Sequence, residues 1–212
     1  MALNINGTTG ISGVDGSVSA PALRGTDNNT GITFPAADTI KFSTGGVERM
    51  QITNSGVTGT GIGAGKILQV KQAFKTDGYS QSSTSFADIT GLSVSITPAS
   101  SSNKILVMVN IFVSVADAAL LRLLRDSTVI GAGTGNSGGS DNTGFAMARM
   151  SASNLSDTHN VTILDTPSTT SATTYKVQGR PTESSANLFV NRRGSDTSYG
   201  AASSITVMEV GA

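Results

Sequence analysis

The sequence has no cysteine and no tryptophan, and few of its residues are charged. Without cysteine there is neither a disulfide framework nor a thiolate metal site, and the absence says nothing about redox compartment. Charged residues make up 13% of the chain, about half of the usual fraction. The 14 basic and 14 acidic residues cancel, so no net charge draws the chain to nucleic acid or to an anionic membrane. We therefore expect no nucleic-acid partner.

Long hydrophobic runs and export signals are also missing. No apolar run approaches the roughly 20 residues that a membrane-spanning helix needs, so we expect no membrane insertion. The start of the chain, MALNINGTTG, has neither the basic stretch nor the apolar core of a signal peptide. We expect synthesis in a cytoplasm and no classical export. Serine, threonine, asparagine and glycine must supply the polar surface, a composition that suits extended β structure better than helices.

The chain changes character near residue 66. The part before it contains about half of all glycines and only two aromatic residues, Phe34 and Phe42, whereas longer apolar runs and every tyrosine follow. We therefore predict a thin N-terminal module at 1–65 and a compact domain at 66–212, joined by the glycine-rich segment Gly56–Lys66. This segment does not fit a phosphate-binding loop, because threonine stands where the first glycine belongs and isoleucine follows the lysine.

The compact domain reads as a series of short strands between turn-like clusters rich in Gly, Ser, Asn and Pro, which indicates a β-sandwich or barrel. One segment, Val115–Asp126, also carries helix formers at helical spacing. We favour a strand there, because RDST makes a turn into VIG, and a helix stays open as the alternative. The predicted strands are Ile67–Ala73, Leu92–Thr97, Lys104–Val115, Ala119–Arg125, Gly144–Ala152, Asn160–Thr166, Thr173–Gly179, Asn187–Arg192 and Ser204–Val210.

The strand Lys104–Val115 is apolar on both of its faces. An antiparallel strand with one face in water alternates apolar and polar residues, but this one does not. One face carries Ile105, Val107, Val109, Ile111, Val113 and Val115, and the other carries Leu106, Met108, Asn110, Phe112 and Ser114. We expect both faces to be covered, one by the domain's own core and the other either by loops of the same chain or by another subunit.

The sequence IKFSTGGVERMQI predicts a small hairpin with an unusual need for a partner. A three-residue loop from Thr44 to Gly46 would place Phe42 opposite Glu48. This register puts four apolar side chains on one face: Ile40, Phe42, Met50 and Ile52. An isolated two-stranded hairpin is marginal in water, and nothing else in 1–65 offers a core. We therefore predict that these four residues form the interface between copies of the chain, arranged as a narrow three-sided prism.

Two groups of motifs are familiar. In Gly10–Gly63 they are SAPALRGTDNNTGI, FPAADTIKFSTGG and ERMQI. In the rest of the chain they are ILQVKQAF, GLSVSITPASSSNKILVMVNI, LRLLRDSTVIG, ILDTPSTTSATTYKVQGR and SSITVMEV. The first group resembles a module of tail fibres and other fibre proteins of tailed bacteriophages, notably marine and cyanobacterial ones. The second resembles phage fibre heads and is similar to jelly-roll trimers of the C1q and tumour-necrosis-factor kind.

The resemblance implies an all-β homotrimer mounted on the virion, with a slim β shaft and a β-sandwich knob. The N-terminal module would be the attachment and shaft part, and residues 66–212 would be a jelly-roll knob. The implied partners are further copies of the chain, other virion proteins reached through residues 1–10, and a host-surface glycan or receptor. The shaft module occurs once in this sequence, and we expect no self-cleaving chaperone domain after the knob. A tail fibre, a fibre tip and a purely structural head or neck decoration fibre therefore stay open.

Patterns for catalysis are weak. Asp141, Asp157 and Asp196 lie in turns rich in Gly, Ser and Asn, where aspartate usually caps its own backbone. The single histidine, His159, has no nucleophile elbow beside it and cannot build a zinc site alone. We therefore expect no enzymatic activity, no cofactor and no metal, and we do not favour a polysaccharide depolymerase.

Two loops are candidates for recognition, Gly131–Gly144 and Asn191–Gly200. The second combines four side chains suited to a glycan: Arg192, Arg193, Asp196 and Tyr199. Arginine forks grip carboxylates and phosphates, and tyrosine stacks on sugar rings. The alternative is that the arginines form intersubunit ion pairs or a solvated edge.

Overall fold

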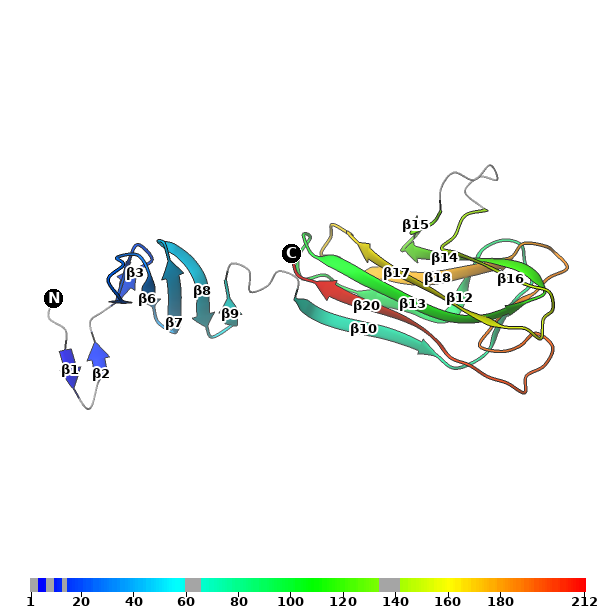
Figure 1. Ribbon diagram of the computed structural model, residues 1–212, viewed down its shortest axis with the longest axis horizontal. Coiled ribbons are helices and arrows are strands. Elements are labelled where there is room, and N and C mark those ends of the chain that lie inside the picture. The colour runs from blue at the N-terminus through cyan, green and yellow to red at the C-terminus, as the bar shows by residue number, and fades with distance from the viewer. Residues whose placement is uncertain (1–3, 7–9, 13–14, 60–65, 134–141) are drawn as a thin grey trace. The chain divides into compact units, whose positions relative to one another are not determined.

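The computed structural model describes residues 4–6, 10–12, 15–59, 66–133 and 142–212. The chain divides into two compact units, Met1–Lys66 and Ile67–Ala212 (Figure 1), one residue from the boundary at which the composition changes. The prediction of an all-β protein is confirmed, since the described residues contain many strands and no α-helix. In this part of the chain no helix is long and apolar enough to cross a bilayer.

The N-terminal unit is built around a five-stranded antiparallel sheet in which each strand pairs with the next along the chain. Its strands are β5 (Leu23–Arg24), β6 (Gly31–Ala36), β7 (Thr39–Thr44), β8 (Val47–Thr53) and β9 (Gly56–Thr58). Two small pairs precede it, β1 (Asn4–Asn6) with β2 (Gly10–Ser12) and β3 (Gly16–Ser17) with β4 (Ala20–Pro21). The β3–β4 pair lies against β6.

The hairpin between β7 and β8 turns on two residues, so the predicted three-residue loop is wrong. Gly45 and Gly46 both have positive φ, 60° and 74°, which is the combination that a type I′ turn requires. Thr44 therefore pairs with Val47. Two glycines in sequence provide this turn without steric cost, because neither has a Cβ.

A β-bulge next to this turn shifts the register between β7 and β8 by one residue. Between the turn and the middle of the hairpin, Arg49 is an extra residue on β8, so Phe42 lies opposite Met50 and Ile40 lies opposite Ile52. The predicted pairing of Phe42 with Glu48 was therefore off by two residues, one from the shorter loop and one from the bulge. The bulge nevertheless leaves these four apolar side chains on one face of the sheet, as predicted, because directly opposed residues of antiparallel strands point to the same side.

The C-terminal unit is a jelly-roll-like sandwich of two antiparallel sheets (Figure 1). The first sheet has β10 (Ile67–Lys75), β20 (Ser203–Val210), β13 (Lys104–Val115), β19 (Leu188–Val190) and β11 (Tyr79–Gln81) in this order, with β17 (Asp157–Asp165) on the other side of β13. The second has β12 (Ala87–Ile96), β18 (Thr173–Pro181), β14 (Asp117–Arg125) and β15 (Thr128–Ile130), with β16 (Ala146–Met150) also along β14.

All nine predicted strands overlap an observed strand. The segment with helical spacing is strand β14, which turns at Asp126, a residue of positive φ, into β15. The prediction missed β11 and the first half of β12. Both lie in a polar, serine-rich stretch without apolar alternation, and β11 exists only through its pairing with the distant β19.

The core lies between the two sheets. Every second residue of β13 from Ile105 to Val115 is at most 3% exposed. These side chains pack with Leu121 and Leu123 of β14 and with Tyr175 of β18, all fully buried. One of the two apolar faces of β13 is thus the core of its own unit, as predicted.

Candidate functional site

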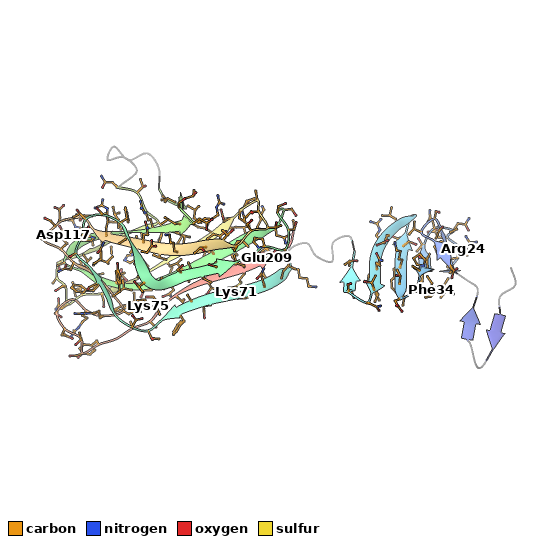
Figure 2. All side chains as sticks on the ribbon, turned by 180° about the vertical axis from the view of Figure 1, so that it is seen from behind. Arg24, Phe34, Lys71, Lys75, Asp117 and Glu209 are labelled. Carbon is orange, nitrogen blue, oxygen red and sulfur yellow. The ribbon has the colours of Figure 1, made fainter. Side chains whose placement is uncertain are left out.

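One face of the N-terminal sheet forms a continuous apolar surface, which we call the shaft face. Two rows of cross-strand neighbours build it: Leu23, Ile32, Phe42 and Met50, then Ile40, Ile52 and Val57. Phe34, labelled in Figure 2, lines a hollow of about 350 Å³ together with Ile40 and Ile52. None of these side chains is buried. The shaft face is therefore larger than the four residues that the sequence singled out.

The N-terminal unit has almost no interior of its own. Its buried residues among 15–59 are Pro21, Thr33 and Ser43, and no large apolar side chain is among them. The Thr33 hydroxyl is buried without a hydrogen-bond partner in the described residues. Burial of apolar surface is the main favourable term in folding, and here a single copy leaves that surface on the outside.

The outer face of the first sheet of the C-terminal unit is also open. Its exposed apolar side chains include Val70 (54%), Phe74 (64%), Met108 (42%) and Leu164 (51%). Met108 and Asn110 of β13 are both exposed, whereas Ser114 near the end of the strand is buried under the loops that carry Ser153 and Gly194. Within the described residues, the chain's own loops therefore leave the middle of this second face open. Of the two coverings that the sequence left open, loops of the same chain account in the described part for the Ser114 end of the face and not for its middle.

The open face carries almost no charge. A hollow of about 310 Å³ in it is lined by Met108, Val109, Asn110, Asn160, Thr162, Ser204 and Thr206. Across the face, Val70, Met208, Leu106 and Leu164 form one apolar cross-strand row. The lack of charge on this face is typical of the core of a protein interface, where charged residues are depleted.

The outer face of the second sheet is different in character. The Arg122 guanidinium lies 3.8 Å from the Phe86 ring centroid, and its Nε donates to Gln178 at 2.8 Å. Gln178 and Lys176 in turn donate to Asp88 at 2.5 and 2.8 Å. The charged side chains on this face pair with one another, and such a face suits contact with water. The outer faces of the two sheets are therefore not equivalent.

A polar cleft lies at the end of the sandwich away from the unit's first and last residues. In the register of β10 with β20, Ile67 lies opposite Val210 and Lys75 lies opposite Ser203. The unit therefore begins and ends at one end, where Figure 2 also shows Glu209, and the turn after β10 lies at the other, distal end. There a hollow of about 280 Å³, the distal cleft, is lined by Thr76, Gly78, Tyr79, Ser80, Asn191, Arg192, Thr197, Tyr199 and Gly200.

Asn191 holds the two sides of the distal cleft together. It is buried, and its φ of 59° is in the left-handed region, which asparagine tolerates better than most residues. Its amide nitrogen donates to the carbonyls of Lys75 and Asp77 at 2.8 and 3.2 Å. Its amide oxygen accepts from Ser203 Oγ at 2.5 Å. The turn after β10 is thus fixed to the loop before β20.

The loop that carries the predicted site is fixed from within. Arg193 donates to Asp196 at 2.6 Å and lies 4.0 Å from the Tyr199 ring centroid. A hydrogen bond from Ser198 N, together with those from Ser195 and Arg193, holds the pKa of Asp196 below its ordinary value. Arg193 and Asp196 therefore bind each other and do not line the cleft.

Arg192 lines the distal cleft. Its Nε donates to the Arg193 carbonyl at 3.0 Å, and its guanidinium carbon lies 4.9 Å from the Phe189 ring centroid. A Cβ added at Gly78 would lie 3.1 Å from Arg192 Cδ, so the missing side chain makes room for the arginine stem. Within the described residues, the two terminal nitrogens of Arg192 have no hydrogen-bond partner.

The structure thus divides the four predicted ligand residues into two pairs. Arg192 and Tyr199 line the cleft, whereas Arg193 and Asp196 hold its loop. Sequence reasoning missed the opposite wall, including Tyr79, and the bridging role of Asn191, since no local pattern links residues more than 110 positions apart. The other candidate loop, Gly131–Gly144, lies mostly outside the described residues.

The candidate acids do not form a cluster in the described residues. Asp157 accepts a hydrogen bond from Thr158 N at 2.7 Å, a local contact, while Asp141 lies outside the described part. His159 is half-buried opposite Ile111, and its Nε2 has no partner within the described chain. The described residues contain no group of three His, Asp or Glu side chains that could hold a metal ion.

The chain matches no family model and no curated protein.

Proposed function

We propose that the chain is a structural fibre protein that assembles as a homotrimer, with residues 1–65 as attachment and shaft module and residues 66–212 as a jelly-roll knob. We further propose that it belongs to the virion of a tailed bacteriophage and that the distal end of the knob contacts the host surface. The observation that supports this proposal most strongly is that each unit leaves one apolar face of a sheet exposed.

The shaft face supports assembly most directly. A large apolar side chain contributes about 1.5–3 kcal/mol only when it becomes fully buried. In a single copy, Ile40, Phe42, Met50 and Ile52 are all half-buried, and the unit's few buried residues cannot replace them. Copies packed face to face would bury both rows at once, and three copies around one axis would close a narrow prism without leaving a face in water.

The C-terminal unit supports the same arrangement independently. Its uncovered outer face is apolar and nearly uncharged, and its other outer face is charged and internally paired. Assembly through the apolar face would bury it and would leave the charged face in water. This matches the composition of interfaces, in which charged residues are depleted from the buried part. The distal cleft would then lie at the end of the knob farthest from where the chain enters it.

The phage and virion parts of the proposal rest on the resemblance of Gly10–Gly63 and of the knob motifs to fibre proteins. They make the virion the expected location and the host-surface glycan the expected ligand. A head or neck decoration fibre with a purely structural role is the second candidate. Such a fibre would assemble through the same open sheet faces as a fibre that contacts the host, so these faces do not distinguish the two. We propose no catalytic activity, and turnover of host polysaccharide by the purified chain would contradict this.

Antibody labelling separates the candidates. An antibody against the purified chain is bound to virions that contain it and is located by electron microscopy. We expect label at the end of the tail and loss of host adsorption when antibody is bound. Label spread over the capsid with normal adsorption would support the decoration fibre, and no label on virions would overturn the virion assignment.

A further inference from the structure

We propose that the distal cleft binds the anionic group of an acidic saccharide and that Arg192 is the anchor. The inference rests on the proposed function, in which the distal end faces the host, and specifies the ligand class that the knob takes. The cleft volume of about 280 Å³ lies just below the roughly 300–1,000 Å³ that is usual for ligand sites, which suits one sugar of a longer chain.

Charge around the cleft favours an anion. The other charged groups nearby are paired: Lys75 with Asp77 at 2.8 Å, Lys176 with Asp88 at 2.8 Å and Arg193 with Asp196 at 2.6 Å. Arg192 forms no ion pair within the described residues. The cleft therefore carries one uncompensated positive charge in a chain whose formal net charge is zero.

The geometry of Arg192 favours a forked acceptor. Its Nε side is occupied by the Arg193 carbonyl and one guanidinium face by Phe189. The remaining edge offers the two terminal nitrogens, which match the two oxygens of a carboxylate or the oxygens of a phosphate. Because the stem is held by Gly78 and Phe189, little side-chain freedom is lost on binding.

The other walls suit a sugar ring. Tyr199 is 63% exposed and is held against Arg193, so its ring is available as a rigid stacking surface for the apolar side of a pyranose. Thr76, Ser80 and Thr197 line the same cleft and offer hydroxyls that both donate and accept. Neutral hydroxyls recognise sugar hydroxyls without competing for the anion.

The cleft is fixed before a ligand arrives. Asn191 joins its two walls, and Gly194 N donates to the Ser153 carbonyl at 2.7 Å. Arg192 and Gly200 also form a β-bridge at the base of the loop. Such preorganisation reduces the entropy that binding would otherwise cost.

Calorimetric titration of the full chain tests the proposal with three defined probes. A hyaluronan tetrasaccharide carries carboxylates, a phosphorylated mannan oligosaccharide carries phosphates, and chitotetraose is neutral. We expect at least one acidic probe to bind and chitotetraose to bind about tenfold or more weakly. The two acidic arms distinguish carboxylate from phosphate as the source of the anion. No binding by either acidic probe, or equal binding of the neutral one, overturns the proposal.

Variants locate the binding. Arg192→Gln keeps hydrogen-bond donors but removes the charge, and we expect it to weaken acidic-probe binding about tenfold. Arg149→Gln is the matched control, because Arg149 is an exposed arginine on the other sheet. Tyr199→Ala should weaken binding with Arg192 intact. Equal affinities of Arg192→Gln and wild type would overturn the assignment of Arg192.

The molecular mass of the same samples separates this inference from the proposed function. If the chain is a trimer and binds no acidic probe, the inference fails and the fibre assembly stands. If the chain binds acidic probes as a monomer, the proposed homotrimer is contradicted and the proposed binding site in the distal cleft is supported.

Discussion

At the scale of single residues, Glu209 is the most unusual group in the C-terminal unit. It is fully buried in β20, and no cation contacts its carboxylate in the described residues. Gln69 and Asn103 side-chain amides donate to it at 2.6 Å each, and Ala99 N donates at 2.7 Å. The carboxylate therefore fixes the turn between β12 and β13 to the last strand, next to the chain end.

Replacing Glu209 by glutamine tests this role. The substitution keeps the shape but turns one acceptor into a donor that faces other donors, so Glu209→Gln should lower the free energy of unfolding by about 2 kcal/mol. Urea unfolding followed by circular dichroism measures it. Glu183→Gln, an exposed acid in a turn, should change nothing, and equal stability of the two variants would contradict the assigned role.

The same carboxylate predicts a pH dependence. Burial raises the pKa of Glu209, but the hydrogen bonds from Gln69, Asn103 and the backbone outweigh it and leave the pKa below the ordinary 4.5. A lowered folded-state pKa means that its stabilisation is present above pH 4.5 and is lost as the pH falls through the folded value. The stability gap between wild type and Glu209→Gln should narrow below about pH 4.5, as urea midpoints from pH 7 to 3 would show. A stability difference that stays constant from pH 7 to 3 would contradict a lowered pKa for Glu209.

Some residue roles were predictable from sequence and others were not. The loop with Arg192 and Tyr199 stood out because charge and aromatic residues occur together in a turn. The opposite wall with Tyr79, and the bridge by Asn191, depend on contacts between distant parts of the chain. Glu209 likewise gives no local signal, because an acid within an apolar strand looks like any surface residue until its partners are in place.

At the scale of elements, the β7–β8 hairpin shows how turn chemistry and register combine. Its apolar face was predictable from alternation, whereas its loop was not, since both a three-residue loop and a two-residue turn plus bulge put the same side chains on one face. The structure chooses the second through Gly45 and Gly46. The long strand β13 was easier to predict from sequence, because a strand of twelve residues has few alternative registers.

The turn can be tested by substitution. Gly46→Val places a β-branched residue at a φ of 74°, where open space around the site cannot relieve the backbone strain of roughly 1–2 kcal/mol. Gly45→Asn is the control, because Asn-Gly is the preferred type I′ pair. Amide hydrogen exchange in the full chain should show faster exchange in β7 and β8 for the valine variant only. Equal exchange in both variants would contradict the type I′ turn.

At the scale of the whole molecule, assembly through the open face of the C-terminal unit should be prevented by a charge placed on that face. Met108→Lys should leave the single chain folded, because this side chain is 42% exposed there. In an assembly it would bury an unpaired ammonium, at a cost of several kcal/mol. Met147→Lys is the matched control, since Met147 is 58% exposed on the other sheet.

Sedimentation velocity and circular dichroism of both variants provide the readout. We expect Met108→Lys to sediment as a single folded chain and Met147→Lys to sediment like wild type. Normal assembly of the Met108 variant would exclude this face from the interface, and loss of assembly in both would show that the effect is not specific to it.

The most direct test is sedimentation equilibrium of the unmodified chain from micromolar down to nanomolar concentration. Both units leave apolar β surface that a single copy cannot bury, so the account predicts a mass of three times the 21.4 kDa chain. A folded species of 21.4 kDa, with the β spectrum and cooperative unfolding of the whole chain, would contradict it.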